Sequence, residues 1–334
     1  MTRVLITGGS GFIGGYLVAQ ALEKGFDVTV ALRPNSDKTR LSDPRLHLLY
    51  LPLHDLAAMT DLLRSTAPFD WVIHNAGVTK ALSKDGYREG NTENTRRLVQ
   101  ALQQADRVPT LFLMVSSLAA LGDAPAGGEW ITADQTPAPL TPYGDSKHKA
   151  EVFLASLPPS FPWIVVQPTA VYGPWERDIL TVIRLASKGL ALTIGLKSQK
   201  LSFIHGSDVA KAIFHILQHP KTQSRQKLIL SDGQKYTTED LVEAISSALG
   251  RKKTLRVRLP LTVVRPIAWI AATIGHWQKQ PAALNPDKIP ELTAENWHCD
   301  ARPLLVTLGF RPEFDLYSGM RNTVNWYRQQ GWLK

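Results

Sequence analysis

Tyrosine, lysine and serine side chains at three positions are suited to proton transfer at a carbon that bears oxygen. Tyr143 and Lys147 lie four residues apart in the stretch Tyr143-Gly144-Asp145-Ser146-Lys147, and side chains with this spacing share one face of a helix. A free phenol has a pKa of about 10 and is a poor base near neutrality, but a neighbouring ammonium favours the phenolate. Ser117, which follows the apolar run Leu111–Val115, can hydrogen-bond the reacting oxygen. We therefore predict general acid–base catalysis by Tyr143, with Ser117 and Lys147 as its partners.

A glycine-rich turn stands between the first apolar run, Val4–Ile6, and the first helical pattern, Ile13–Glu23. Gly9, Gly11 and Gly14 have the spacing of a dinucleotide-binding turn, and Gly8 with the last two fits its close variant. Glycine is needed because the turn is tight and its backbone must approach a pyrophosphate, which the amides at the helix start then bind. The predicted cofactor contacts in this turn are Gly8, Gly9, Ser10, Gly11, Phe12, Ile13 and Gly14.

The end of the second apolar run indicates which dinucleotide binds. Proteins that prefer NAD place a carboxylate there to hold the ribose 2′-hydroxyl. This chain reads Val30-Ala31-Leu32-Arg33, so Arg33 can hold a 2′-phosphate instead, with Ser10, Lys38 or Arg40 nearby. A solvated Arg33 is the alternative interpretation. We predict NADP as the cofactor, with Arg33 and Arg40 among its contacts, and NAD as the alternative.

Strand-like and helix-like segments alternate through the first half of the chain, as is typical of a parallel sheet with helices on both faces. The expected buried strands are Val4–Ile6, Val28–Leu32, Leu46–Leu51, Trp71–Ile73, Leu111–Val115 and Trp163–Val166. The expected helices are Ile13–Glu23, Leu56–Leu63, Thr92–Gln104 and Tyr143–Ala155. Consecutive β-α-β units connect right-handedly. The predicted fold class is therefore α/β, a doubly wound parallel sheet (Rossmann fold) with a smaller C-terminal substrate lobe.

The second half of the chain is less regular. Helices are expected at Ile179–Lys188, Asp208–Gln218 and Leu241–Leu249, the last capped by Thr237 or Thr238, with a strand around Leu201–Ile204. Trp326 to Trp332 is expected to form a helix that docks by its aromatic face. We predict a dinucleotide-binding domain formed by residues 1–174 and 203–231, a substrate lobe formed by 175–202 and 232–315, and a C-terminal docking helix at 316–334.

The longest apolar stretch is Leu259–Trp277. Pro260, Arg265, Pro266 and His276 interrupt it, whereas a membrane span needs roughly 20 mostly apolar residues. We therefore predict no integral membrane span. A buried or lid helix is the preferred interpretation, and a helix that rests on a membrane surface is the alternative if the substrate is a lipid.

Composition excludes several other classes of protein. The net charge of +9 comes from scattered basic residues, and the densest run, Arg251-Lys252-Lys253 with Arg256 and Arg258, is short, so we predict no nucleic-acid partner. The single cysteine, Cys299, rules out an internal disulfide and a cysteine-based zinc cluster, and we predict no metal. Met1-Thr2-Arg3 leads straight into the first apolar run and not into a secretory leader. The expected location is the cytoplasm.

With these motifs, the chain resembles the extended short-chain dehydrogenase/reductase superfamily, also called the NAD-dependent epimerase/dehydratase family, over nearly its whole length. His74-Asn75-Ala76-Gly77 resembles the family's cofactor-supporting turn, Asp55-Leu56 its adenine-side contact, and Asn91 its supporting helix asparagine. Pro168–Pro174 resembles the segment that closes over the nicotinamide, and Phe203–Ala210 the late signature.

This resemblance implies a set of further contacts. The cofactor contacts that it adds to the glycine turn and to Arg33 and Arg40 are Asp55, Leu56, Asn75, Ala76, Gly77, Tyr143, Lys147, Pro168 and Val171. His74 and His205 are expected to be packing residues and not bases. The resemblance also implies a homodimer that pairs through Thr92–Gln104 and Tyr143–Ala155.

The sequence departs from the family pattern at two places. Gln167 stands where many relatives have arginine, which puts in doubt the substrate-anion contact usually made there. Leu118-Ala119 follow Ser117, where the 4,6-dehydratases of the family have Asp-Glu. Since neither side chain can act as an acid or base, the sequence argues against sugar dehydration.

Two functions within the family remain open. The first is an NAD(P)-dependent oxidoreductase that transfers a hydride between a nicotinamide cofactor and a carbonyl or secondary alcohol of an apolar small molecule, similar to dihydroflavonol reductases and 3β-hydroxysteroid dehydrogenases. Arg33 supports it, and Val263–Trp277 could line an apolar pocket. The second is a nucleotide-sugar epimerase with tightly bound NAD, whose substrate diphosphate could meet Arg251–Arg258. Trp175-Glu176-Arg177-Asp178 also resembles sugar-nucleotide relatives.

A regulatory dinucleotide sensor without catalysis is a third function. The retention of Ser117, Tyr143 and Lys147 together disfavours it.

Overall fold

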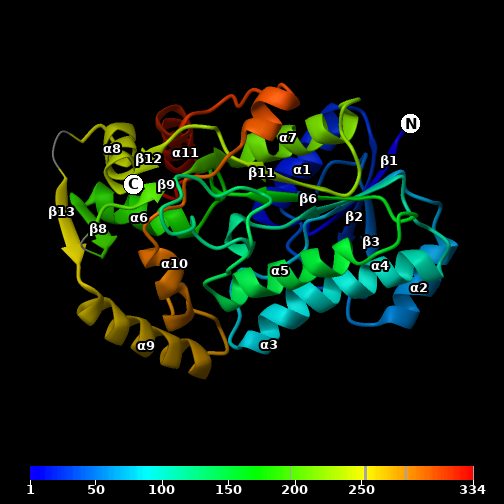
Figure 1. The fold of residues 1–334 in the computed structure, drawn as a ribbon, viewed down its shortest axis with the longest axis horizontal. Coiled ribbons are helices and arrows are strands. Elements are labelled where there is room, and N and C mark those ends of the chain that lie inside the picture. Colours follow the sequence, from blue (N-terminus) through cyan, green and yellow to red (C-terminus); the bar gives the residue numbers. More distant parts are fainter. Residues whose placement is uncertain (196, 252–253, 283, 334) are drawn as a thin grey trace.

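The centre of the molecule is a seven-stranded parallel sheet (Figure 1). The computed structural model describes residues 1–195, 197–251, 254–282 and 284–333. The strand order is β11-β6-β5-β4-β1-β2-β3, which confirms the predicted doubly wound α/β fold class. The strands are β1 (Arg3–Thr7), β2 (Asp27–Leu32), β3 (His47–Tyr50), β4 (Trp71–His74), β5 (Leu111–Val115), β6 (Trp163–Pro168) and β11 (Gln226–Leu230).

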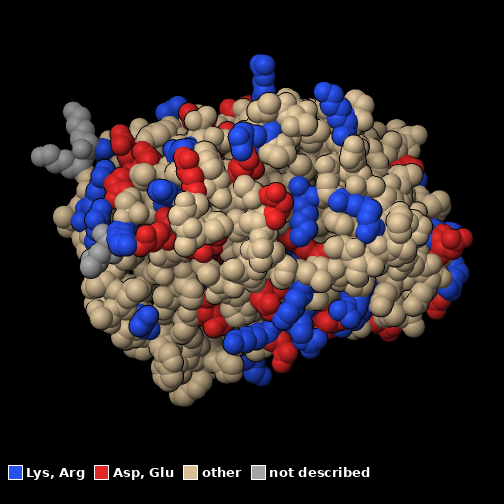
Figure 2. Space-filling model, viewed as in Figure 1, with Lys and Arg blue, Asp and Glu red and all other residues tan. Residues whose placement is uncertain are grey.

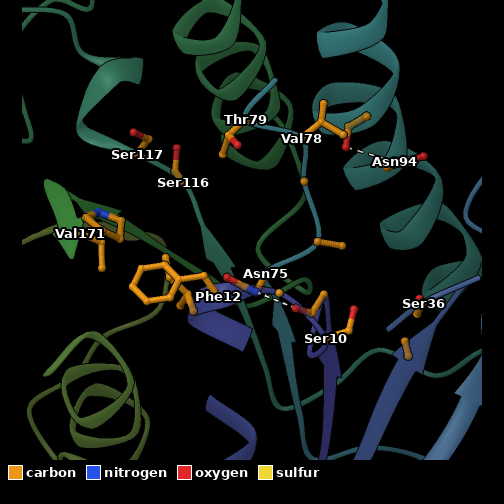
Figure 3. Close-up of a pocket in the computed structure, with 18 of the residues that line it drawn as sticks. Ser10, Phe12, Ser36, Asn75, Val78, Thr79, Asn94, Ser116, Ser117 and Val171 are labelled. Atoms are coloured by element: carbon orange, nitrogen blue, oxygen red, sulfur yellow. Dashed lines mark hydrogen bonds between the residues drawn. The ribbon is translucent and has the colours of Figure 1, made fainter. Parts of the chain in front are cut away.

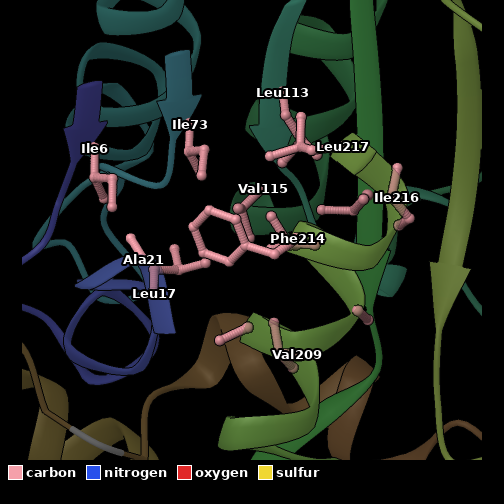
Figure 4. Packing of buried hydrophobic residues seen from close by; sticks show 14 of the residues in the cluster. Ile6, Leu17, Ala21, Ile73, Leu113, Val115, Val209, Phe214, Ile216 and Leu217 are labelled. Carbon is pink, nitrogen blue, oxygen red and sulfur yellow. The ribbon is translucent and has the colours of Figure 1, made fainter. Parts of the chain in front are cut away.

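Helices cover both faces of this sheet. On one face, α1 (Phe12–Glu23) packs beside α7 (Gly206–Gln218), and Phe214 lies against Leu17 and Val115 in the core between them and the strands (Figure 4). The other face carries α2 (Leu56–Ser65), α4 (Asn94–Gln104) and α5 (Pro142–Ala155) over a second buried cluster. Burial of apolar side chains on both sides is what a parallel sheet requires.

The strand order places a crevice beside the first strand. β1 pairs with β2 on one side and with β4 on the other, so the connections leave in opposite directions and open a gap at the carboxyl ends of these strands. α1 starts directly after β1, and Ser116 and Ser117 directly follow β5. The fold therefore brings the predicted glycine turn and the predicted catalytic serine to the same edge of the sheet.

Most of the remaining elements form a second layer with its own core, in which side chains of α6, α8 and α11 pack together, whereas η2 packs against α5 and η4 against β11. Three two-stranded sheets, β7–β10, β9–β12 and β8–β13, belong to it. The bounds are η2 (Leu118–Ala120), β7 (Ala170–Tyr172), α6 (Asp178–Ser187), β8 (Leu190–Ile194), β9 (Lys200–Leu201), β10 (Phe203–His205), β12 (Tyr236–Thr237), α8 (Thr238–Ala248), β13 (Leu255–Leu259), α9 (Leu261–Trp277), η3 (Pro286–Lys288), α10 (Ile289–Thr293), η4 (Pro303–Thr307) and α11 (Leu316–Gln329).

Most predicted elements are confirmed, and the structure differs from the prediction in four details, two in each half of the chain. β3 is an edge strand with half-exposed side chains and is not buried, because only β2 pairs with it. The single strand expected at Leu201–Ile204 is interrupted at Ser202, and its two parts, β9 and β10, pair with different strands. A short helix, α3 (Lys84–Tyr87), and a π-helix, η1 (Arg88–Glu93), precede α4. The C-terminal helix begins at Leu316 and ends before Trp332.

The long apolar stretch forms α9, a helix, but it is not buried. The side chains of Trp269 and Trp277 are 68% and 88% exposed. Among the described residues, no helix is long and apolar enough to cross a membrane. Thr237 caps α8 and forms a reciprocal capping box with Asp240, as one of the two predicted alternatives has it.

Candidate active site

Two glycines of the turn after β1 have no room for a side chain. Gly8 has a φ of +70°, and a β-carbon there would lie 2.7 Å from the amide nitrogen of Ala76. A β-carbon on Gly14 would lie 2.0 Å from the carbonyl oxygen of Gly8. The turn is therefore pressed against the segment after β4 and against the start of α1, which is the close approach that a pyrophosphate-binding turn needs.

The N-terminus of α1 is left open toward solvent. Its N-cap is Gly11, no side chain caps it, and its first turn has no acidic residue. The first amides of a helix have no partner within the helix, and they carry a partial positive charge. Gly8, Ser10, Gly11, Phe12 and Ile13 line a cavity of about 490 Å³ here. These residues fit the phosphates of a dinucleotide.

The segment after β4 forms the opposite wall of this cavity. Asn75 donates from its Nδ2 to the Gly8 carbonyl oxygen at 3.2 Å, and the Ala76 amide donates to Thr7 Oγ1 at 3.0 Å. In the close-up, Ser10 and Asn75 lie at the base of the cavity, with Ser116 and Ser117 across from them and Ser36 at the far end (Figure 3). The cavity thus extends from the end of β2 to the end of β5.

His74 supports this segment from below. Its Nδ1 contacts Thr7 Oγ1 at 2.8 Å and its Nε2 contacts Thr95 Oγ1 at 3.0 Å. Burial, with a smaller effect of the Lys147 charge, lowers the pKa of His74 to about 3. His205 is also buried, which lowers its pKa to about 4, and its ring packs against Tyr172 and Phe314. Both histidines are neutral packing residues.

Tyr143 lies in the first turn of α5, at the end of the cavity. Thr141 caps this helix by accepting a hydrogen bond from the Gly144 amide at 3.1 Å, and Pro142 occupies its first position, an arrangement that favours a helix start. Burial raises the pKa of Tyr143 to about 12, and a hydrogen bond with the Ser117 hydroxyl opposes this rise. Ser117 and Tyr143 both line the cavity, so two of the three predicted catalytic side chains lie together.

Lys147 lies deeper, one turn along α5. It is buried, its Nζ donates to the Val115 carbonyl oxygen at 3.0 Å, and it does not line the cavity. A β-carbon on Gly77 would lie 3.0 Å from this Nζ and 2.7 Å from Asn91 Oδ1. Burial lowers the pKa of Lys147 to about 8, and the charge of Glu151 opposes this change. The ammonium therefore lies beneath the segment after β4.

Asn91 holds this part of the site in place. It lies in η1 and accepts from the Val78 amide at 2.9 Å, while its Nδ2 donates to the Val78 carbonyl oxygen at 3.0 Å and to Ser146 Oγ at 2.9 Å. One side chain thereby connects η1, the segment after β4 and α5. Single turns of π-helix are frequent at functional sites, and this one directs Asn91 inward.

The model of the NAD dependent epimerase/dehydratase family matches residues 4–230. This chain belongs to that family. A ceramide reductase of Caulobacter vibrioides is 26% identical over 332 residues, which cover 99% of this chain and 96% of that protein. A decarboxylating sterol-4-alpha-carboxylate 3-dehydrogenase of Candida albicans is 24% identical over 353 residues, with 98% of each covered. The crystal structure of a Thermotoga maritima UDP-glucose 4-epimerase has the same fold, with a TM-score of 0.78, 18% identity and coverage of 98% and 99%.

Membership makes the chain an NAD-dependent enzyme of the extended short-chain dehydrogenase/reductase type. Of the expected cofactor contacts, Gly9, Gly14 and Lys147 do not line the cavity, and three others lie elsewhere in the structure. Asp55 caps α2 by accepting from the Ala58 amide at 3.0 Å, and neither it nor Leu56 lines the cavity. Arg40 points its guanidinium at the first turn of α1, where it donates to the Phe12 carbonyl oxygen at 3.1 Å. It lies over the rings of Tyr16 and Trp175 and does not line the cavity.

Several residues that line the cavity of this family member were not predicted. At the end near β2, Leu51 and Leu53 take the place expected for Asp55 and Leu56, and Ser36 lies beside Arg33. At the other end, Thr79, Glu176 and Asp178 line the wall, with Pro168 and Val171, which were predicted. The sequence holds one signal for the acidic pair, since Trp175-Glu176-Arg177-Asp178 resembles sugar-nucleotide relatives. Nothing in the local pattern around Leu51 or Thr79 indicated a contact.

A second cavity, of about 280 Å³, adjoins the first at Tyr143. Both are lined by Thr79, Tyr143, Val171 and Asp178. Tyr87 and Pro142 complete its inner wall, and Asp287, Lys288 and Glu291, from η3 and α10, belong to its rim. No residue of α9 is among those that line these two cavities, so the expectation that Val263–Trp277 lines an apolar pocket does not apply to them.

Proposed function

We propose that this enzyme transfers a hydride between NADP and the carbonyl or secondary-alcohol carbon of a lipid-like molecule, with Tyr143 as the general acid and base. The observation that carries the proposal is the position of Tyr143 between two cavities. One cavity leads to the glycine turn and suits the dinucleotide, and the other is free for a substrate. Two titratable side chains line both cavities, Tyr143 and Asp178. Asp178 forms an ion pair with Lys80, so we assign the proton transfer to the phenol of Tyr143.

The bound dinucleotide supplies or accepts the hydride, and the protein's residues handle the proton. Because burial holds the pKa of Tyr143 at about 12, its hydroxyl keeps its proton near neutrality and can donate it to a carbonyl oxygen during reduction. Ser117 hydrogen-bonds the same oxygen and fixes its position. A positive charge at Lys147 favours the donation by Tyr143 because it stabilises the phenolate that remains, and in the reverse direction the phenolate takes a proton from the alcohol.

The preference for NADP rests on the end of the cavity near β2. Arg33 and Ser36 line it, and the acidic residues of the described lining, Glu176 and Asp178, lie in the segment before and at the start of α6. No carboxylate of that lining stands where it would bind a ribose 2′-hydroxyl and repel a 2′-phosphate. We expect Arg33→Ala to weaken NADP binding by about tenfold or more with little effect on NAD, measured by isothermal titration. Tighter binding of NAD by the unaltered enzyme would contradict this assignment.

The substrate class rests on the relatives. Two relatives that align over nearly the whole chain carry the names of a ceramide reductase and a sterol dehydrogenase. In the second cavity, Tyr87, Pro142 and Val171 offer apolar contacts, and Lys288 on the rim offers a charge for a polar head. We therefore propose a ketone or secondary alcohol on a lipid as the substrate. We also propose that Asn75, Ala76, Gly77 and Pro168, which line the first cavity, contact the cofactor, and that Lys147 supports them from beneath.

The test is NADPH oxidation with long-chain 3-keto amides and 3-ketosteroids. The unaltered enzyme should consume NADPH with at least one of them. Tyr143→Phe should lower kcat by about 1,000-fold or more and leave the Kd for NADP nearly unchanged, because the ring is retained. Normal turnover in Tyr143→Phe would remove the proposed chemistry. Purification with bound NAD, together with interconversion of two sugar nucleotides without added cofactor, would instead identify an epimerase.

A further inference from the structure

The outer face of α9 is apolar and exposed. Val263, Ile267, Ile270, Ile274 and Trp277 follow one another at alternating intervals of four and three residues, which places them in one stripe on a helix. Each of them is at least 44% exposed, and Trp269 beside the stripe is 68% exposed. The side that packs on the protein carries the small residues Ala268 and Gly275 with Val264. The larger apolar side chains of this helix therefore face solvent.

This stripe forms one continuous surface. Of all described residues, half of the large hydrophobic side chains that are exposed fall between Leu255 and Trp277. In the space-filling view the projection at the lower left, where α9 lies in Figure 1, is tan apart from one basic group, while clusters of acidic and basic groups lie on the left edge and along the lower middle (Figure 2). A continuous apolar surface of this kind marks an interaction site, unlike isolated exposed side chains.

The charges of the segment that contains the stripe have one sign. Between Glu243 and Asp287 the sequence contains no aspartate or glutamate, but it contains arginines and lysines on both sides of α9. Arg256, Arg265 and Lys279 are exposed, and the described residues provide no ion pair for any of the three. Lys252 and Lys253 of the same basic run lie outside the described residues. An occupant of this face must therefore tolerate apolar contact at the centre and supply negative charge at the margin.

We propose that α9 lies in the plane of an anionic lipid membrane, with the stripe in the boundary between headgroups and acyl chains. Helices that bind in this way combine an apolar face with flanking cations, and tryptophan favours the boundary because its ring is apolar with one polar edge. A second copy of the chain fits less well. Any pairing of two α9 helices would bring cations against cations, since neither copy has a carboxylate in this segment.

In this position on the membrane, α9 would bring the second cavity close to the lipid surface. α9 packs against η3, and η3 and α10 supply Asp287, Lys288 and Glu291 to the cavity rim. A membrane beneath α9 would thus lie next to the elements that border this rim, so a lipid could pass from the membrane to Tyr143. The membrane contact itself needs no turnover; only this consequence rests on the proposed function.

Flotation of the full chain with vesicles tests the contact without any assay of activity. We expect the chain to float with vesicles of phosphatidylcholine and phosphatidylglycerol, less so at high salt, and much less with phosphatidylcholine alone. The double variant Ile270→Glu/Ile274→Glu should bind the anionic vesicles at least about tenfold more weakly. The matched control is Val306→Glu, since Val306 is 74% exposed in η4 and away from the stripe; it should bind as the unaltered chain does.

A second measurement covers the case that the double variant does not fold, as judged by circular dichroism. An environment-sensitive fluorophore on Ile270→Cys should shift to the blue on anionic vesicles, and one on Val306→Cys should not; the native Cys299 is buried and does not compete. Absence of flotation, equal binding to both vesicle types, or unchanged binding of the folded double variant would overturn the proposal. So would a dimer in solution that the double variant separates, with no vesicle binding, because the occupant would then be a second copy.

Discussion

Glu151 is a fully buried carboxylate whose only cationic contact among the described residues is the ammonium of Lys227. The Lys227 Nζ lies 2.8 Å from Glu151 Oε2, and the side chains of the two residues are 24% and 0% exposed. Ser116 donates its hydroxyl to Oε1, and the Gln167 amide donates to both oxygens at 3.0 Å. Replacing Lys227 by methionine keeps the apolar stem and leaves the charge of Glu151 without an ion-pair partner among the described residues, while its interaction with the Lys147 charge remains.

The expected loss of stability follows from this burial. Breaking a fully buried ion pair costs about 3–5 kcal/mol. Because Lys227 reaches solvent in part and the hydrogen bonds from Ser116 and Gln167 persist, we expect Lys227→Met to lower the free energy of unfolding by about 2–3 kcal/mol. For a chain of this length, that loss should lower the Tm by roughly 3–4 °C. Urea and thermal unfolding followed by circular dichroism measure both quantities.

Two further variants test whether the buried charge of Glu151 causes the loss of stability in Lys227→Met. Adding Glu151→Gln to Lys227→Met removes the uncompensated charge, so the double variant should recover to within about 1 kcal/mol of the unaltered enzyme. Lys211→Met removes a pair with Glu313 whose side chains are 41% and 55% exposed, and it should cost less than about 0.5 kcal/mol. If Lys227→Met is no less stable than Lys211→Met, or if Glu151→Gln does not rescue it, the reasoning fails.

Two other predictions concern Lys147 and Asp55. Since burial lowers the pKa of Lys147 from 10.5 to about 8, its ammonium is present below that pH and is lost above it. The value of kcat/KM for ketone reduction should therefore fall as the pH rises through about 8, and Lys147→Arg, if it retains activity, should lack this alkaline decline; a decline that persists in Lys147→Arg would assign it to another group. Asp55→Ala removes the N-cap of α2 and should cost about 1 kcal/mol of stability with an unchanged Kd for NADP, whereas a large rise in that Kd would return Asp55 to the cofactor site.

The parts of the site that could be predicted are those set by local backbone geometry. Gly8 has a φ of +70° in the turn and Gly14 lies against the Gly8 carbonyl oxygen, both within one β-turn-α unit, and Tyr143 and Lys147 share a helix whose cap, Thr141, directly precedes it. Such requirements depend on residues a few positions apart, so spacing alone reveals them. The alternation of apolar runs likewise predicted strands β1, β2, β4, β5 and β6, because strands in the middle of a parallel sheet are buried on both faces.

Exposure and long-range contacts could not be predicted in this way. β3 and α9 are both apolar in sequence, yet β3 lies at the edge of the sheet and α9 at the surface. An apolar pattern gives the type of element, and its position in the fold decides whether it is covered. The cavity wall near the end of β2 could not be predicted either, because the local pattern does not reveal that Leu51 and Leu53 line the cavity while Asp55 caps α2.

The departure at Gln167 shows how a distant residue can change the meaning of a local one. From the sequence, glutamine in place of arginine suggested a lost contact with a substrate anion. In the structure Gln167 is buried and turned toward Glu151 on α5, so this position does not face the cavities. The cation that neutralises Glu151 is Lys227 of β11. In the sheet, Lys227 lies opposite Val165, which is two residues before Gln167 and on the same face of β6. Glu151 raises the pKa of Lys147, so the charge that Lys227 holds in place also helps to keep the active-site ammonium protonated.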